Sequence, residues 1–253
     1  MKKPLIFITN DDGVRAQGIA ELIEVARPLG DVLVIAPDGP RSGNSNAITM
    51  EIPIVYKLLR QEPGLTVYEC TGTPTDCAKL AFYIGERQPD FIFSGINHGS
   101  NTAINVIYSG TMGAVFEGCV RGVPSVGFSL CDHKERADFS YCKPIFGQIA
   151  EKVLREGLPQ GVCLNVNAPI GRLNGVRVCR QADGFWDEEF VLGQSPFGKD
   201  YGWMTGFFSN REPEKQDTDI YAIESGFVSV VPTRVDMTAH EVLRQLSDYE
   251  SIR

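Results

Sequence analysis

The chain has 253 residues, of which 43% are hydrophobic and 22% charged, and its formal net charge at neutral pH is −8. This length and composition are typical of a folded protein with a sizeable core, and they argue against intrinsic disorder. The acidic balance argues against a protein that binds nucleic-acid polymers or anionic membranes through bulk charge.

The start of the chain predicts a strand, a helix and a second strand. The apolar runs "LIFIT" (5–9) and "DVLVIAP" (31–37) have the length and composition of buried strands. Between them, apolar side chains recur at helical spacing, at Ile19, Leu22, Ile23, Ala26 and Leu29. Two strands joined by a helix in this way form a parallel pair.

The same alternation continues to about residue 170. Helices are predicted at "PTDCAKLAFYIGE" (74–86), "SGTMGAVFEGCVRG" (109–122) and "CKPIFGQIAEKVLREG" (142–157). Strands are predicted at "DFIFSG" (90–95), "PSVGFSL" (124–130) and "VCLNVN" (162–167). The pattern predicts an α/β fold, a Rossmann-like and mainly parallel sheet flanked by helices, whose ligands bind beyond the carboxyl ends of the strands.

The pattern changes after residue 170. Short strands and hairpins are predicted at "GVRVCRQ" (175–181), "DEEFVLG" (187–193), "GWMTGFFS" (202–209) and "FVSVVP" (227–232), followed by a helix at "TAHEVLRQLSDYE" (238–250). Within this part, Asp217 and Asp219 of "DTD" are interpreted as a turn and a helix cap. We therefore expect a single domain over 1–253, with a core over 1–170 and an antiparallel hairpin extension with a C-terminal helix over 171–253.

Polar side chains gather where the predicted strands end. Asp11 and Asp12 follow the first strand directly. The other clusters are Asp38, Arg41, Ser42, Asn44 and Asn46 after the second strand; Ser94, Asn97, His98 and Asn101 after "DFIF"; and Ser109, Gly110 and Thr111 at the start of a helix. Because parallel strands end at one edge of the sheet, these clusters are expected to converge.

The residue types in these clusters favour a metal and a phosphate. Carboxylate, hydroxyl and amide oxygens suit Mg²⁺ or Mn²⁺, and a helix N-terminus with Ser, Gly and Thr presents N–H groups to an anion. Adjacent acids such as Asp11 and Asp12 repel each other unless a cation or hydrogen-bond donors hold them. Together, these features predict metal-assisted phosphoryl transfer or hydrolysis.

Each cluster by itself has a simpler interpretation. Asp-Asp-Gly alone is commonly a turn, Ser109 can be only a helix cap, and His98 can be a packed or hydrogen-bonded loop residue. Response-regulator receiver domains are excluded, since Ser94 stands where their phospho-acceptor aspartate is expected. Haloacid dehalogenase phosphatases are excluded as well, because Asn10 stands where their nucleophilic aspartate is expected, and an amide cannot replace it.

The cysteines and the N-terminus predict a cytoplasmic protein. The seven cysteines are odd in number, contain no CxxC pair and fall mostly in apolar segments, which is typical of reduced, packed thiols. The N-terminal apolar run is too short for a secretory signal, and no run approaches the ~18 apolar residues that span a bilayer.

Six motifs in order resemble those of the SurE family, the survival-protein nucleotidases. They are "TNDDG", "APDGPRSGNSN", "GTPTDC", "SGIN", "VIYSGT" and "LNVN", and the resemblance extends to the late "DTD" and "GFVSVVP" stretches. The resemblance implies a metal-dependent phosphatase of nucleoside monophosphates, with a Rossmann-like fold and a C-terminal extension that pairs or swaps between subunits of a homodimer or homotetramer.

The resemblance also implies roles for individual residues. One divalent metal per subunit, Mg²⁺ or Mn²⁺, would be bound by Asp11, Asp12, Ser42 and Asn97. The phosphate contacts would be Asn101, Ser109, Gly110 and Thr111, with Asn46 and Gly43 as neighbours. Asp11 and Asp12 would be the catalytic residues, with Asp11 taking a proton from the attacking water.

Two positions depart from the family's pattern. Gln17 stands where proline is common, and "TAIN" (102–105) stands where a glycine and one or two acids are usual. No implied metal ligand is lost, so the activity that the resemblance implies, hydrolysis of nucleoside 5′-monophosphates, should be retained, and activity on 3′-monophosphates is left open. The alternatives are a phosphatase of non-nucleotide phosphoesters or polyphosphate, and a non-catalytic nucleotide-binding module.

Overall fold

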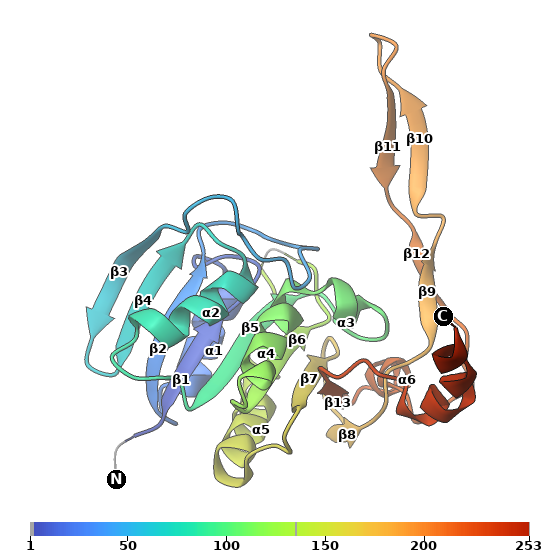
Figure 1. Cartoon of the computed structure of the whole chain (residues 1–253). Helices are drawn as coiled ribbons and strands as arrows, with labels where there is room; N and C mark the ends of the chain where they lie inside the picture. Colours follow the sequence, from blue (N-terminus) through green and yellow to red (C-terminus); the bar gives the residue numbers. More distant parts are fainter. Residues whose placement is uncertain (1–2, 135, 253) are drawn as a thin grey trace.

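A nine-stranded sheet forms the centre of the computed structural model, which describes residues 3–134 and 136–252 (Figure 1). In chain order its strands are β1 (Leu5–Thr9), β2 (Asp31–Pro37), β3 (Tyr56–Glu62), β4 (Leu65–Cys70), β5 (Phe91–His98), β6 (Ser125–Leu130), β7 (Val162–Ala168), β8 (Val176–Val178) and β13 (Val228–Arg234). Across the sheet the order is β3-β4-β2-β1-β5-β6-β7-β13-β8.

The six strands from β4 to β7 in this order are mutually parallel, which confirms the predicted mainly parallel sheet, although β4 itself was not predicted from the sequence. From β1 the chain continues to β2, which pairs with one side of β1, and later returns to β5, which pairs with the other side of β1. This reversal is a topological switch point, where the loops that follow neighbouring strands separate and leave room for a ligand. The predicted site residues follow β1 and β2 or lie at and beyond the end of β5, and are therefore at this point.

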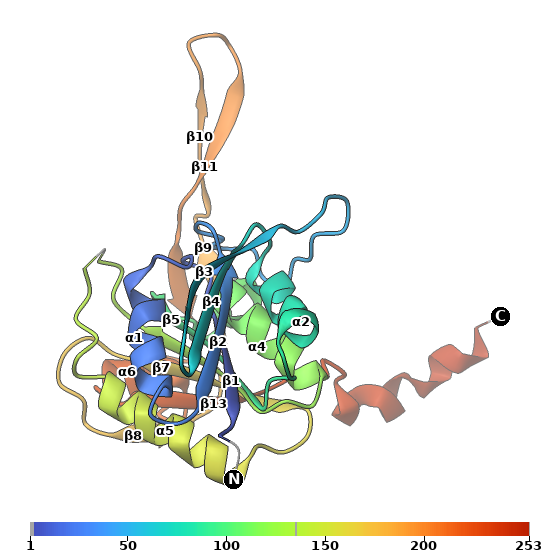
Figure 2. The same ribbon diagram turned by 90° about the vertical axis from the view of Figure 1, so that its left-hand side faces the viewer.

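Helices cover both faces of the sheet (Figure 2). They are α1 (Gln17–Ala26), α2 (Pro74–Ile84), α3 (Asn105–Tyr108), α4 (Gly110–Val120), α5 (Lys143–Glu156) and α6 (Asp219–Glu224). α1 packs against α5 on one face, and α2 packs against α4 on the other. Each pair buries one side of the same strands, so the sheet is apolar on both faces, as expected for parallel strands under helices.

The structure contains elements that the sequence pattern did not predict. β3 is an edge strand paired antiparallel with β4, and most of its side chains are exposed, so it carries no run of buried residues. α3 and α6 have four and six residues, too few for a helical stripe to be read from the sequence. The predicted strand at 202–209 is interrupted, because the chain turns at Gly206 with a positive φ of 108°.

An arm of two hairpin segments projects from the body of the protein (Figure 1). It consists of β9 (Gly184–Asp187), β10 (Phe190–Gln194), β11 (Asp200–Met204) and β12 (Phe207–Asn210), with β9 paired to β12 and β10 to β11, all antiparallel. A 3-10 helix, η1 (His240–Ser251), extends sideways at the end of the chain (Figure 2). The predicted hairpin extension and C-terminal helix are confirmed.

One part of the predicted extension belongs to the core. β13 pairs antiparallel with β7, and β8 pairs with β13, so both extend the central sheet. The apolar alternation of "FVSVVP" predicts a strand but cannot show which strand it pairs with. Of the helices that the structure describes, none is both long and apolar enough to cross a membrane.

Candidate active site

The site residues lie at the carboxyl edge of the parallel sheet. Asp11 and Asp12 follow β1, Asn97 lies near the end of β5, and Ser109 precedes α4. The pairing of β5 with β6 shifts register between Ser94 and Asn97, so the end of β5 departs from regular strand geometry. The fold thus brings together clusters that are almost 100 residues apart in the chain.

Asp11 is the most deeply buried acid of the site. Its side chain is 5% exposed, and its Oδ1 accepts a hydrogen bond from Thr111 Oγ1 at 2.5 Å. Burial raises the pKa of the Asp11 carboxyl to about 6; the charge of Asp12 also raises it, while the Thr111 hydroxyl lowers it. Asp11 therefore takes up a proton far more readily than an exposed aspartate.

Asp12 is held from the end of β5. Its Oδ2 accepts hydrogen bonds from the backbone N–H of His98 and from His98 Nδ1, both at 3.2 Å. The His98 ring lies edge-on to Phe139, with ring centroids 5.2 Å apart. His98 is hydrogen-bonded, as expected, but it is the last residue of β5 and not a loop residue; its contacts orient the Asp12 carboxylate.

The Asn97 amide is fixed by its own loop. Its Nδ2 donates to the carbonyl oxygen of Gly99 at 2.9 Å, and the side chain is largely buried. Since the amide nitrogen is used in this way, its Oδ1 is the atom that Asn97 offers to a ligand.

The loop after β2 carries Ser42 and Asn46 to the same edge. The backbone N–H of Arg41 donates to the carbonyl oxygen of Asp11 at 2.7 Å. Because Ser42 is the next residue, this bond holds the backbone of Ser42 near Asp11. The Ser42 side chain is exposed. Further along, Asn46 lies against the first turns of α4, where a Cβ at Gly113 would be 3.0 Å from Asn46 Oδ1 and 2.4 Å from the Ser45 carbonyl oxygen. Glycine is needed at position 113 for this close approach.

The start of α4 lies directly against Asp11. Ser109 is the N-cap, and its Oγ accepts from Met112 N at 3.0 Å. A Cβ at Gly110 would stand 2.9 Å from Asp11 Cβ, so only glycine allows this contact. The partial positive charge of the helix N-terminus favours the carboxylate here, and it would favour a phosphate equally. The Thr111 hydroxyl already donates to Asp11, so its observed contact is with the acid.

Asn101 lies in a buried network of amides. Its Nδ2 donates to Ser129 Oγ at 3.0 Å, its backbone N–H donates to Asn167 Oδ1 at 2.8 Å, and its carbonyl oxygen accepts from Asn165 Nδ2 at 2.8 Å. Asn165 and Asn167 come from the "LNVN" segment, where spacing by two places both on one face of β7. These bonds fix the orientation of the Asn101 side-chain amide, its backbone N–H and its carbonyl oxygen.

The donor set suits a hard divalent cation. Asp11, Asp12, Ser42 and Asn97 supply only oxygen atoms, and neither Asp11 nor Asp12 has an ion pair with lysine or arginine among the described residues. Two adjacent carboxylates without such a partner make a site that a cation would stabilise. Within the described part of the chain, no group of three or more His, Cys, Asp or Glu side chains could hold a metal, so a metal here needs the serine and amide oxygens.

A cleft of about 680 Å³ opens beside Asp12. Its walls come from the loops after β1, β2, β5 and β6, and they include His98 and the cationic side chains of Arg15, Lys134 and Arg136. The cleft gives a ligand access to Asp12 and offers positive charge to an anion.

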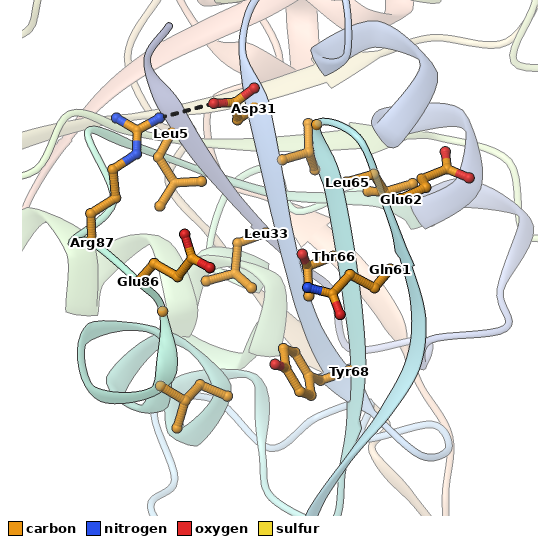
Figure 3. A pocket seen from close by; sticks show the side chains of 14 residues that line it. Leu5, Asp31, Leu33, Gln61, Glu62, Leu65, Thr66, Tyr68, Glu86 and Arg87 are labelled. Carbon is orange, nitrogen blue, oxygen red and sulfur yellow. Dashed lines mark hydrogen bonds and ion pairs between the residues drawn. The ribbon is translucent and has the colours of Figure 1, made fainter. Parts of the chain in front are cut away.

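A second cavity, of about 350 Å³, lies at the opposite edge of the sheet (Figure 3). It is lined by Leu5 and Asp31, the first residues of β1 and β2, and by Arg87, whose Nη2 is 3.3 Å from Asp31 Oδ2. Since Asp11 and Asp12 follow the other end of β1, this cavity has no part in the candidate site.

Sequence reasoning assigned no role to several residues around the site. The most prominent are Ser129, Asn165 and Asn167, which hold Asn101. The alternation of asparagines in "LNVN" was a usable signal for two of them. Asp219 was interpreted as a helix cap, but the N-cap of α6 is Thr218. No local signal shows that Asp219 Oδ2 accepts from Ala103 N at 2.8 Å, because the two residues are 116 positions apart in the chain.

Comparison with known proteins gives a consistent result. The profile of the family described as "Survival protein SurE" matches residues 6–188. A protein of Phocaeicola vulgatus named 5′-nucleotidase SurE is 51% identical over 98% of this chain and 97% of its own length. One of the same name from Bacteroides thetaiotaomicron is 52% identical over 98% of this chain and 96% of its own. The crystal structure of the SurE protein from Aquifex aeolicus superimposes with a TM-score of 0.83 at 33% identity, covering 98% of this chain and all of that one.

Proposed function

The chain belongs to the SurE family, and on that premise we propose that it hydrolyses nucleoside 5′-monophosphates, and 3′-monophosphates as well, with one bound divalent metal ion. As a member of this family it is an enzyme, a 5′-nucleotidase. The observation that carries the proposal for its mechanism is the contact between Asp11 and the start of α4, which sets a pair of carboxylates beside an anion-binding helix end.

Asp11, Asp12, Ser42 and Asn97 would hold the metal, Mg²⁺ or Mn²⁺. When bound, such an ion polarises a phosphoryl oxygen and favours attack by water. His98 orients Asp12 through two hydrogen bonds, and Gly99 fixes the Asn97 amide, so both oxygen donors are held before a metal arrives. Preorganised donors of this kind bind a cation without a further ordering cost.

The phosphate would be held by Asn46, Asn101, Ser109, Gly110 and Thr111. Of these, Ser109 and Gly110 lie at the start of α4, where the helix dipole favours the negative charge of the transferred phosphoryl group. Thr111 supports this arrangement by holding the Asp11 carboxylate.

Asp11 is the residue proposed to take the proton of the attacking water. Its carboxyl lies at the start of α4, beside the residues proposed to hold the phosphate, which is where the attacking water would have to lie. In the reaction, an oxygen of water forms a bond to phosphorus as the bond between phosphorus and the ester oxygen breaks. The products are the nucleoside and inorganic phosphate.

A second substrate class is favoured by one feature of the site. Arg15, Lys134 and Arg136 line the cleft beside Asp12, and such a positive wall suits substrates with additional phosphate groups, such as short polyphosphate. This is the candidate for a non-nucleotide substrate.

The test is phosphate release from a panel of 5′- and 3′-nucleoside monophosphates, an aryl phosphate and short polyphosphate. Each substrate is tested with Mg²⁺, Mn²⁺ or EDTA. We expect release from the nucleotides with metal and none with EDTA. Equal release with EDTA would contradict the metal, and nucleotide binding without release from any substrate would leave a binding module instead of an enzyme.

We further propose that the protein is cytoplasmic and assembles as a homodimer or homotetramer. All seven cysteines are free thiols in the structure, and five of them are buried, which supports a reducing compartment. The exposed apolar side chains of the arm support assembly.

A further inference from the structure

Asp219 is a buried carboxylate that joins three separate segments of the chain. It is the first residue of α6, and its side chain is 0% exposed. Its Oδ2 accepts from Ala103 N at 2.8 Å, and its Oδ1 accepts from Ala182 N and Ile220 N, both at 2.9 Å. Ala103 belongs to the loop after β5, and Ala182 lies just before β9, at the root of the arm.

Capping of α6 does not account for this carboxylate. Thr218 is the N-cap, and its Oγ1 accepts from Tyr221 N at 3.2 Å. Burial of a carboxylate is costly, and it raises the pKa of Asp219. The carboxylate instead connects α6 to two other segments of the chain, through its hydrogen bonds with the backbone N–H groups of Ala103 and Ala182.

The Ala103 contact lies in a segment that needs external support. Ala103 has a φ of 50°, a left-handed conformation that is unfavourable for a residue with a Cβ. Two residues earlier, Asn101 is fixed by the amide network of β7. Two residues later, Asn105 Oδ1 accepts from Trp186 Nε1 of the arm at 2.8 Å.

Taken together, the segment 101–105 is tied at three points. One tie comes from β7, one from Asp219, and one from the arm through Trp186. This segment joins the end of β5, which carries Asn97, to α3 and the start of α4. Its conformation therefore decides how Asn101 and the helix end face each other.

We infer that Asp219 and Trp186 are positioning residues of the enzyme, which hold the 101–105 segment so that Asn101 is directed at the substrate phosphate. The inference rests on the proposed function. Neither residue touches the substrate; both act through the loop. When Asp219 is replaced, the buried N–H of Ala103 loses its partner, and the loop can relax out of its left-handed conformation.

The test compares Asp219→Asn with Asp217→Asn. The first keeps the shape of the side chain but places an amide N–H₂ against a backbone N–H; the second changes an exposed acid two residues away, which forms an ion pair with Arg180. We expect Asp219→Asn to raise the KM for a nucleoside monophosphate, and the Ki of inorganic phosphate, at least tenfold. Mn²⁺ affinity should stay within twofold of the wild type, because no implied metal ligand lies in the segment. Asp217→Asn should leave all three unchanged.

A further control separates positioning from general destabilisation. Val153→Ala removes buried side-chain volume from α5, far from the loop, and lowers Tm without touching the site. It should leave the Ki of phosphate unchanged. If Asp219→Asn remains folded with a wild-type KM and Ki, the inference is wrong.

A second variant keeps the test decisive if Asp219→Asn does not fold. Trp186→Phe keeps an aromatic ring but removes the N–H that Asn105 accepts, and we expect it to raise the Ki of phosphate about threefold. A wild-type Ki for this variant would overturn the inference. If the wild type itself releases no phosphate, the proposed function fails, but calorimetric titration with inorganic phosphate still compares the variants.

Discussion

The carboxyl edge of the sheet and the projecting arm differ in how far their side chains are buried within a single chain. At the edge, Asp11 and Asn101 are 5% and 6% exposed; the Asp11 carboxylate accepts from Thr111, and Asn101 has three hydrogen-bond partners. On the arm, Leu192, Phe197 and Trp203 are 80%, 91% and 69% exposed. A single chain thus buries and orients the polar side chains of its site but leaves large apolar side chains of the arm in water.

This difference indicates which surface each region serves. Buried polar groups with partners are costly to disturb, so substitutions at the edge should change chemistry or stability. Exposed apolar groups contribute little to a monomer, and contiguous ones mark contact surfaces. Substitutions on the arm should therefore change assembly and leave the fold of the chain intact.

The largest expected effect is that of Asp12→Asn at the edge. The amide removes one of two adjacent charges that would hold the metal but keeps the size of the side chain. We expect nucleotidase kcat to fall by roughly 10³-fold, with Tm within a few degrees of the wild type. Steady-state kinetics with Mn²⁺, together with thermal unfolding, checks this result. Near-normal turnover in the folded variant would remove Asp12 from the metal site.

The second prediction concerns the bond between Thr111 and Asp11. Thr111→Val keeps the shape of a buried side chain and removes the hydroxyl that donates to Asp11 Oδ1. We expect kcat/KM to fall about 10- to 100-fold and stability to fall by about 1–3 kcal/mol, because a buried carboxylate oxygen loses its donor. Denaturant unfolding and steady-state kinetics measure the two effects. Thr111→Ser, which retains the hydroxyl, is the matched control and should recover most of the activity.

The third prediction is a pH dependence that originates in Asp11. Its pKa in the folded protein is raised to about 6, so the folded state binds a proton here more tightly than an unfolded chain does. Without metal, protonated Asp11 should therefore stabilise the folded state at pH 4. This contribution to the free energy of unfolding should be lost as pH rises through about 4 to 6. Below pH 6, a proton competes with the cation, and metal affinity should fall up to tenfold per pH unit.

Titration calorimetry with Mn²⁺ between pH 5 and 8 checks this dependence. Asp11→Asn provides the control, since its residual metal affinity should lose this component of the pH dependence. A metal affinity that is constant from pH 7 down to pH 5 would contradict the assignment of Asp11 as a ligand.

The smallest effect on the single chain is expected on the arm. Leu192→Ser and Trp203→Ser remove exposed apolar side chains from β10 and β11. We expect the unfolding free energy of the monomeric unit to change by about 0.5 kcal/mol or less. The proposed dimer or tetramer should dissociate at higher protein concentration than the wild type. Light scattering after size exclusion measures this, and Lys199→Ser, an exposed change on the same arm, is the control. An unchanged mass distribution for both apolar variants would show that these side chains are not at a subunit interface.

Much of the fold could be predicted because its strands and helices have strong local patterns. "LIFIT" and "DVLVIAP" became β1 and β2, and the stripe that includes Ile19 and Leu22 became the buried face of α1. β3 was missed since six of its seven side chains are exposed and no period of buried residues marks it. α6 was missed because a helix of six residues carries less than two turns of pattern.

The sequence by itself determined which residues could form the site. The acids after β1, the amide after β5 and the Ser-Gly-Thr helix start are visible as residue types at strand and helix ends, and a parallel sheet brings such ends together. Motifs shared with the SurE family added the implied roles.

Only the tertiary structure decided how those residues are held. The contact of Thr111 with Asp11, the amide network around Asn101 and the junction at Asp219 join residues 64 to 116 positions apart. Likewise, β13 lies beside β7 because hydrogen bonds across the sheet select its partner, which its own alternating pattern cannot specify. Local patterns report the periodicity and the burial of an element, whereas hydrogen-bond partners depend on which elements the fold brings together.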